Sequence, residues 1–272
     1  MAEDPFLTDP GKVVPDAGAD HEGEARDAAI ALDLAGFGAV DTWIFDLDNT
    51  LYPAHTNLFA QVDERIGKYV ETLLGISAAD ARTLQKAYYR DYGTTLRGLM
   101  TEHGITADAF LDFVHDIDHS PVLPDPRLGA AIERLPGRRF IMTNGTKAHA
   151  EKVARRLGVE AHFADIFDIV AADLLPKPER ATYEKFLKLH GIDPRRAAMF
   201  EDLSRNLRVP ADLGVRTVLV VPGGIREVFR EDWELEGQEA THVHFVTDDL
   251  AAFLENVLDA IDPIRGALRG ER

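Results

Sequence analysis

The fold of this chain is decided by a short stretch that reads Trp43-Ile44-Phe45-Asp46-Leu47-Asp48-Asn49-Thr50-Leu51. Its first three residues are apolar, and such a run is typical of a strand buried in a parallel sheet. Asp46 and Asp48 follow where the strand would meet its loop, at the edge where open α/β sheets bind ligands. Two carboxylates held together repel each other unless a cation offsets the repulsion, and carboxylate oxygens suit Mg²⁺. The stretch therefore predicts a metal-assisted carboxylate site.

Outward from this stretch, apolar runs alternate with amphipathic helical segments. The expected strands span residues 42–45, 139–142, 166–171, 198–200, 215–221 and 243–246. The expected helices between them span residues 148–157, 179–190, 206–213 and 248–260. Strands that alternate with helices form βαβ units, so we expect an α/β fold built on a central parallel sheet.

One region breaks this alternation, because residues 56 to about 119 show helical spacing almost throughout. Helices are expected at 78–92, 94–103 and 107–117, with glycines marking their ends. The pattern predicts an all-helical insert, residues 55–120, between the first and second strands of a core formed by residues 38–54 and 121–272. Residues 1–37 are expected to form an acidic tail, disordered over most of its length, with a short helix at 26–36 leading into the core.

Composition excludes several classes of function. The chain of 272 residues carries 30 basic and 47 acidic residues, a formal charge of −17, and has no cysteine. Thiolate chemistry and cysteine-ligated zinc are therefore excluded, and a basic surface for nucleic acid polymers or anionic membranes is not expected. No apolar run reaches the ~18 residues of a membrane span, and the acidic N-terminus does not look like a secretory signal. We expect a cytoplasmic monomer or homodimer that takes a small phosphorylated metabolite.

Four polar segments fall in order at expected strand ends or in the loops beyond them. They are Asp46-Leu47-Asp48, then Thr143-Asn144-Gly145, then Lys177 between two prolines, and finally Glu201-Asp202 with Asn206 beyond it. Each segment alone is common as a turn, a helix cap or a solvated loop. Together they resemble the four motifs of the haloacid dehalogenase (HAD) superfamily of phosphohydrolases. The resemblance covers about residues 41–260 and implies a Rossmannoid three-layer fold.

The chemistry of the first motif follows from its two acids. A phosphate monoester is a dianion, so an anionic nucleophile needs a cation such as Mg²⁺ to shield it. Asp46 is the expected nucleophile, which would form an aspartyl-phosphate that water then cleaves. Asp48 would protonate the leaving oxygen and later deprotonate the water. The resemblance also implies that the peptide carbonyl of Asp48 is a Mg²⁺ ligand.

The remaining motifs supply phosphate and metal contacts. Thr143 and Asn144 are expected to hold phosphate oxygens, and Lys177 brings a compact positive charge to the nucleophile and the phosphate. Asp202 is expected to complete the metal site with Asp46 and Asp48. For Glu201 and Asn206, a contact with the site through water and a purely local helix-capping role are both open.

Asp48 also separates subclasses of the superfamily. The resemblance implies that the dehalogenases and phosphonatases of the superfamily generally lack an Asp at this position, because they do not protonate a phosphate-ester leaving group in this way. A phosphomutase would keep the acid, so Asp48 does not distinguish a hydrolase from a mutase. A phosphatase is the more economical interpretation.

The helical insert resembles the alpha-helical C1 cap of the superfamily, which contacts the substrate beyond its phosphate. Residues 46–53 and 88–99 are similar to the pyrimidine 5′-nucleotidase branch, which implies hydrolysis of UMP or CMP. Glu201 and Leu203 depart from the last motif of that branch. Four residues are candidates for contacts with base or sugar: Tyr92, Arg97, His55 and Asn57.

Other interpretations of the same residues stay open. Tyr88, Tyr89 and Tyr92 lie at helical spacing and would serve equally as core residues, while His103, His115 and His119 are expected to be ordinary surface or interface residues. The substrate could also be phosphoglycolate, a sugar phosphate or pyridoxal phosphate. A non-catalytic sensor of phosphometabolites is disfavoured, since Asp46, Asp48 and Lys177 are all present.

Overall fold

The chain forms a six-stranded parallel sheet with helices on both faces. The computed structural model describes residues 34–223 and 237–269. The strands follow the order β3-β2-β1-β4-β5-β6. They are β1 (Thr42–Phe45), β2 (Arg138–Met142), β3 (Asp165–Phe167), β4 (Ala197–Glu201), β5 (Arg216–Val220) and β6 (Phe245–Thr247). Every neighbouring pair is parallel, which confirms the predicted α/β class.

The helices lie in the connections between strands, except the last, which follows β6. They are α2 (Leu58–Leu74), α3 (Ala78–Tyr92), α4 (Thr95–His103), α5 (Ala107–Val114), α6 (Pro126–Arg134), α7 (Lys147–Leu157), α8 (Arg180–His190), α9 (Ser204–Leu213) and α10 (Leu250–Arg269). Short 3₁₀ turns are η1 (Ala35–Ala39), η2 (Ala54–Thr56), η3 (Glu160–His162) and η4 (Pro194–Arg196). Within the described ranges, no helix combines the length and apolar character needed to cross a membrane.

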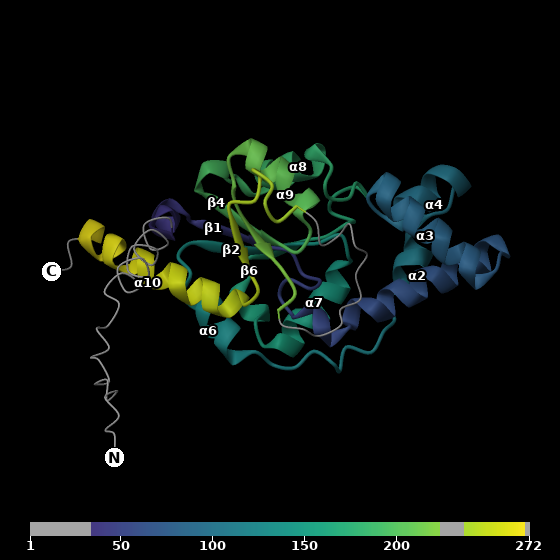
Figure 1. Cartoon of the computed structure of the whole chain (residues 1–272), viewed down its shortest axis with the longest axis horizontal. Helices are drawn as coiled ribbons and strands as arrows, with labels where there is room; N and C mark the ends of the chain where they lie inside the picture. Colours follow the sequence, from purple (N-terminus) through teal and green to yellow (C-terminus); the bar gives the residue numbers. More distant parts are fainter. Residues whose placement is uncertain (1–33, 224–236, 270–272) are drawn as a thin grey trace, which may run out of the picture.

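The alternation of side chains along each strand builds two cores, one on each face of the sheet. In β1, Trp43 and Phe45 enter the core formed with α6, α7 and α10, whereas Ile44 enters the core formed with α8 and α9. Successive residues of a strand point to opposite faces, so a fully apolar strand must be covered on both sides. Figure 1 shows the resulting three layers, with the sheet between the two sets of helices.

Helices α2–α5 form a separate layer that packs around its own apolar cluster beyond the sheet (Figure 1). Ser77 begins α3 by accepting a hydrogen bond from the Asp80 amide, and Thr94 begins α4 in the same way through the Arg97 amide. Between these helices, Gly93 has a φ of +82°. An added Cβ there would lie 3.3 Å from Cγ of Pro176, so glycine allows the helical layer to approach the loop that carries Lys177.

Several boundaries differ from the sequence-based expectation. The third strand was expected over residues 166–171 but ends at Phe167, because Asp168 accepts hydrogen bonds from the Lys147 and Ala171 amides and turns the chain. Helix α5 ends at Val114 instead of residue 117. The ring of the next residue, His115, bonds to the Leu111 carbonyl at this end.

The start of the core also differs from the expected boundary. Residues 1–33 of the predicted tail, with most of the helix expected at 26–36, lie outside the described residues. Leu34 and Phe37 are buried in the core of the α6, α7 and α10 face, and the Phe37 ring stacks on Trp43 with centroids 5.9 Å apart. Core packing therefore includes Leu34 and Phe37, inside the segment 1–37.

Candidate active site

The sheet brings three of the four motifs to one edge. β1 lies between β2 and β4, and all three are parallel, so their carboxyl ends meet. Asp46 follows β1, Thr143 follows β2 and Asp202 follows β4. The Asp46 amide donates to the Phe200 carbonyl at 2.9 Å, which extends the ladder by one residue and fixes the direction of the acid. The placement of these residues follows from the topology of a parallel sheet.

Lys177 reaches this edge from the loop between β3 and α8. Its Nζ donates to Oδ1 of Asp46 at 2.6 Å, to Oε1 of Glu201 at 2.9 Å and to the Met142 carbonyl at 2.9 Å. These contacts use all three ammonium protons. Burial acts to lower the pKa of Lys177, but the two carboxylates outweigh it and raise that pKa well above its usual range. The lysine therefore remains a fixed positive charge.

Asn144 holds the lysine loop in place. Its Oδ1 accepts from the Lys177 amide at 2.8 Å, and its Nδ2 donates to the Lys177 carbonyl at 3.2 Å. Thr143 lies buried beside it, and its Oγ1 accepts from the Gly145 amide at 2.9 Å. Both residues were expected to hold phosphate. The structure shows that the Asn144 amide is already bonded to the backbone that carries Lys177.

Asp46 is held by one donor on each carboxylate oxygen. Lys177 bonds to Oδ1, and the Thr50 hydroxyl donates to Oδ2 at 3.2 Å. Burial raises the pKa of Asp46 to about 7, and the charges of Glu201 and Asp48 add to this against the pull of Lys177. The side chain is oriented for attack, yet it stays fully ionised at neutral pH only with further positive charge nearby.

A metal ion fits this charge balance. At the sheet edge the cavity is lined by four carboxylates, those of Asp46, Asp48, Glu201 and Asp202, and by the Lys177 ammonium. Oxygens of Asp46, Glu201 and Asp202 lie within 4.8 Å of one another. Asn206 donates from Nδ2 to Glu201 at 2.6 Å, while its Oδ1 is buried without a hydrogen-bond partner among the described residues. Clustered oxygen donors with an unsatisfied acceptor beside them match a hard divalent cation. Glu201, whose role the sequence left open, belongs to this cluster.

Within the part of the chain that the structure describes, the Asp48 carboxylate accepts hydrogen bonds through one oxygen. Its Oδ1 accepts from the Tyr52 hydroxyl at 2.6 Å and from Nε2 of His149 at 3.1 Å. Burial acts to raise the pKa of Asp48, but His149 and both hydrogen bonds outweigh it and lower that pKa below its ordinary value. The sequence did not single out His149, since it belongs to none of the four motifs and its spacing is that of an ordinary helix residue.

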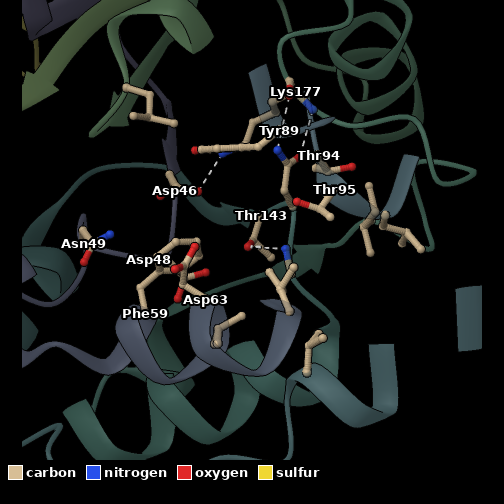
Figure 2. Close-up of a pocket in the computed structure, with 18 of the residues that line it drawn as sticks. Asp46, Asp48, Asn49, Phe59, Asp63, Tyr89, Thr94, Thr95, Thr143 and Lys177 are labelled. Carbon is tan, nitrogen blue, oxygen red and sulfur yellow. Dashed lines mark hydrogen bonds and ion pairs between the residues drawn. The ribbon is translucent and has the colours of Figure 1, made fainter. Parts of the chain in front are cut away.

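A cavity extends from these acids into the helical layer (Figure 2). The layer contributes apolar side chains to its wall, namely Phe59, Val62, Ile66, Leu96, Phe110, Leu111 and Val114. It also contributes polar side chains, namely Asp63, Gln85, Lys86, Tyr89, Thr94, Thr95 and His115. The buried Asp63 carboxylate fixes part of this wall by accepting from Gln85 and from Lys86, each at 2.8 Å.

The four residues expected to contact base or sugar do not line this cavity. The Tyr92 hydroxyl donates to Glu102, and Arg97 pairs with Glu179 at 2.9 Å. His55 faces a second pocket between η2 and the start of α10, and Asn57 joins η2 to α2. Their substrate contacts remain predictions. His115, expected to be an ordinary surface or interface residue, lies in the cavity wall.

The comparison with known families agrees with this geometry. Residues 40–214, more than half of the chain, match the family model of haloacid dehalogenase-like hydrolases. The chain belongs to this family. This HAD-like hydrolase shares 26% identity over 199 residues with Phosphate metabolism protein 8 of Saccharomyces cerevisiae. The match covers 65% of this chain and 60% of the yeast protein.

Solved structures show the shared fold. A HAD phosphatase from Thermococcus onnurineus superposes with a TM-score of 0.53 at 15% identity, covering 81% of this chain and 99% of that one. An L-2-haloacid dehalogenase superposes with a TM-score of 0.51 at 14% identity, covering 80% and 99%. One neighbour is a phosphatase and the other a dehalogenase, so the choice between reactions depends on the residues of the HAD site.

Proposed function

We propose that this HAD-like hydrolase is a Mg²⁺-dependent phosphomonoesterase that works through an aspartyl-phosphate and prefers pyrimidine 5′-nucleotides. One observation carries the proposal: a second acid, Asp48, lines the same cavity as the Asp46–Lys177 pair. A dehalogenase has no use for a proton donor to an ester oxygen. A phosphomonoester with a poor leaving group needs one.

The reaction would proceed in two steps. In the first, a carboxylate oxygen of Asp46 forms a bond to phosphorus, the ester P–O bond breaks, and Asp48 gives its proton to the departing oxygen. In the second, Asp48 takes a proton from water as that water attacks phosphorus, and the Asp46–phosphorus bond breaks to regenerate the carboxylate. Binding of a phosphate dianion would raise the pKa of Asp48 and favour the protonated form that the first step requires.

Asp46, Asp202 and the Asp48 carbonyl are the proposed Mg²⁺ ligands, with Glu201 beside them. When bound, Mg²⁺ supplies positive charge that shields the phosphate dianion from the nucleophile. Lys177 already neutralises part of the cluster at Asp46 and Glu201. The remaining negative charge is the reason to expect a cation there as well.

We propose that helices α2–α5 act as the cap that selects the substrate. The surface of the cavity is mainly apolar, and the helices also bring Gln85 and Lys86 to its wall. Such a wall suits a flat heterocycle whose edge carries hydrogen-bonding groups, and it suits a small charged acid such as phosphoglycolate poorly. The name of the yeast relative refers to phosphate metabolism, which supports a phosphate ester over a haloacid.

A substrate panel tests this function. Phosphate release should be followed with UMP, CMP, AMP, GMP, ribose 5-phosphate, phosphoglycolate, pyridoxal phosphate and 2-chloropropionate, the last by halide release, in Mg²⁺ and in EDTA. We expect kcat/KM for UMP and CMP to exceed that for AMP by at least about tenfold, the effect of ~1.4 kcal/mol of differential binding. Equal rates for all monophosphates would contradict the proposed pyrimidine preference. Activity undiminished in EDTA would contradict the proposed requirement for Mg²⁺. The expected cytoplasmic location and monomeric or homodimeric state stay predictions.

A further inference from the structure

A histidine outside the four motifs is bonded directly to the proposed acid–base residue. His149 lies in the first turn of α7, where it is 1% exposed. Its Nε2 is 3.1 Å from Oδ1 of Asp48, and its Nδ1 is 3.0 Å from Nε2 of His119. Both ring nitrogens are therefore engaged, so the imidazole has one orientation, with Nε2 directed at the acid.

The bonding partners determine where the protons lie. An ionised carboxylate only accepts hydrogen bonds, so Nε2 of His149 carries a proton and donates it to Asp48. The Tyr52 hydroxyl donates to the same oxygen at 2.6 Å. Burial, followed by the charge of Asp48, raises the pKa of Tyr52 well above its ordinary value, so this hydroxyl remains a donor.

The two oxygens of the Asp48 carboxyl group have different roles, because both hydrogen-bond donors contact the same oxygen. Oδ1 accepts from both Tyr52 and His149. The other oxygen, Oδ2, is then the one on which a transferable proton resides, because Oδ1 is occupied in both the ionised and the protonated forms. We propose that His149, together with Tyr52, is a positioning residue that directs Oδ2 of Asp48 toward the leaving-group oxygen.

His119 extends this arrangement toward the helical layer. It lies in the segment that returns from α5 to α6, and its ring is 5.1 Å from the ring of His149 between centroids. Burial lowers the pKa of His119 below its ordinary value, so the ring is neutral near pH 7. Through its bond to Nδ1, the segment that joins the cap to the core sets the plane of His149, and with it the donor to Asp48.

The inference rests on the proposed phosphatase function, and it makes a selective prediction about leaving groups. Phenyl phosphate and 4-nitrophenyl phosphate have the same ring and the same phosphate, but nitrophenolate leaves without help from an acid. Misplacing the acid should therefore slow formation of the aspartyl-phosphate from phenyl phosphate only, whereas the second step, in which Asp48 acts as the base, is common to both esters. General acid catalysis typically contributes ~10²–10⁴-fold.

The experiment compares two variants on these two esters in saturating Mg²⁺. His149→Phe keeps the ring and loses both hydrogen bonds. His149→Gln keeps an N–H donor at about the reach of Nε2. We expect His149→Phe to lower kcat/KM, which reports only the steps up to departure of the leaving group, by about 100-fold for phenyl phosphate and by less than about threefold for 4-nitrophenyl phosphate. His149→Gln should restore most of the lost rate. The control is His103→Phe, at an exposed position on α4, which should leave both esters unaffected.

Each outcome has one meaning. Equal losses of kcat/KM on both esters in His149→Phe, or no rescue of kcat/KM by His149→Gln, would overturn the positioning role while leaving the phosphatase function standing. Should His149→Phe fail to fold, Tyr52→Phe provides the same comparison, because it removes the other donor to Oδ1 and should give the same selectivity. A wild-type protein that hydrolyses no phosphomonoester would instead overturn the proposed function and the inference with it. Independently of activity, the ¹⁵N spectrum of the His149 ring should show a proton on Nε2, and a ring without it would refute the assignment.

Discussion

Nζ of Lys177 lies 2.6 Å from Oδ1 of Asp46, although 131 positions separate the two residues in the chain. Both side chains are almost fully buried, where a charge is strongly disfavoured unless an opposite charge lies beside it. The ammonium orients the carboxylate, and the carboxylate, with Glu201, keeps the ammonium charged. The pair is at once the structural centre of the site and the basis for assigning Asp46 as the nucleophile.

Replacing Asp46 should abolish turnover and leave the fold intact. Asp46→Asn keeps the size of the side chain, but an amide does not form the proposed acyl-phosphate, so kcat should fall on the order of 10⁴-fold or more. The melting temperature should change by only a few degrees, because Lys177 retains Glu201 as a partner. Phosphate release and circular dichroism measure the two effects. Substantial turnover by Asp46→Asn would remove Asp46 from the nucleophile role.

Replacing Lys177 should cost stability as well as activity. Lys177→Met keeps the length of the side chain but leaves Asp46 and Glu201 buried together without a cation, which should lower the free energy of unfolding by about 3–5 kcal/mol. Urea unfolding in EDTA measures this loss. Lys188→Met, an exposed position on α8, is the matched control. A loss no larger than that of the control would show that the pair does not stabilise the fold.

Removing a carboxylate from the acidic cluster should weaken the binding of Mg²⁺. Asp202→Asn takes away one of the three clustered oxygen ligands, so the Mg²⁺ concentration for half-maximal activity should rise by at least about tenfold. Asp212→Asn, at an exposed position on α9, controls for the change in net charge. The measurement is a Mg²⁺ titration of phosphate release. An unchanged titration curve in Asp202→Asn would place the metal elsewhere.

His115 should make the protein less stable in mild acid. Burial, with a contribution from His149, lowers its pKa from 6.5 to about 4. The unfolded chain then binds this proton first as the pH falls, so stability present above pH 6.5 is lost progressively toward pH 4, by up to about 3 kcal/mol. His115→Asn retains a donor for the Leu111 carbonyl and does not titrate. Urea unfolding between pH 7 and pH 4 should show a shallower decline for His115→Asn, and parallel curves would contradict this assignment.

Much of the fold was predictable because it follows from local pattern. The run Trp43 to Phe45 indicated a strand buried on both faces, and β1 covers Thr42–Phe45 with every residue buried. The strand expected at 166–171 and the helix expected at 107–117 were predicted too long, because hydrogen bonds of the Asp168 and His115 side chains end these elements. Such endings depend on one or two side-chain hydrogen bonds, which hydrophobic periodicity does not report.

The sequence alone determined the parallel sheet and the order in which Asp46, Thr143, Lys177 and Asp202 arrive at its edge, because these are properties of strand pattern and motif position. Only the tertiary structure decided which groups touch. In the structure, Asn144 bonds to the Lys177 backbone, Glu201 lies in the acidic cluster, and His149 bonds to Asp48. The physical reason is that a hydrogen bond is specified to a few tenths of an ångström, and that precision arises only when helices and loops distant in sequence pack together.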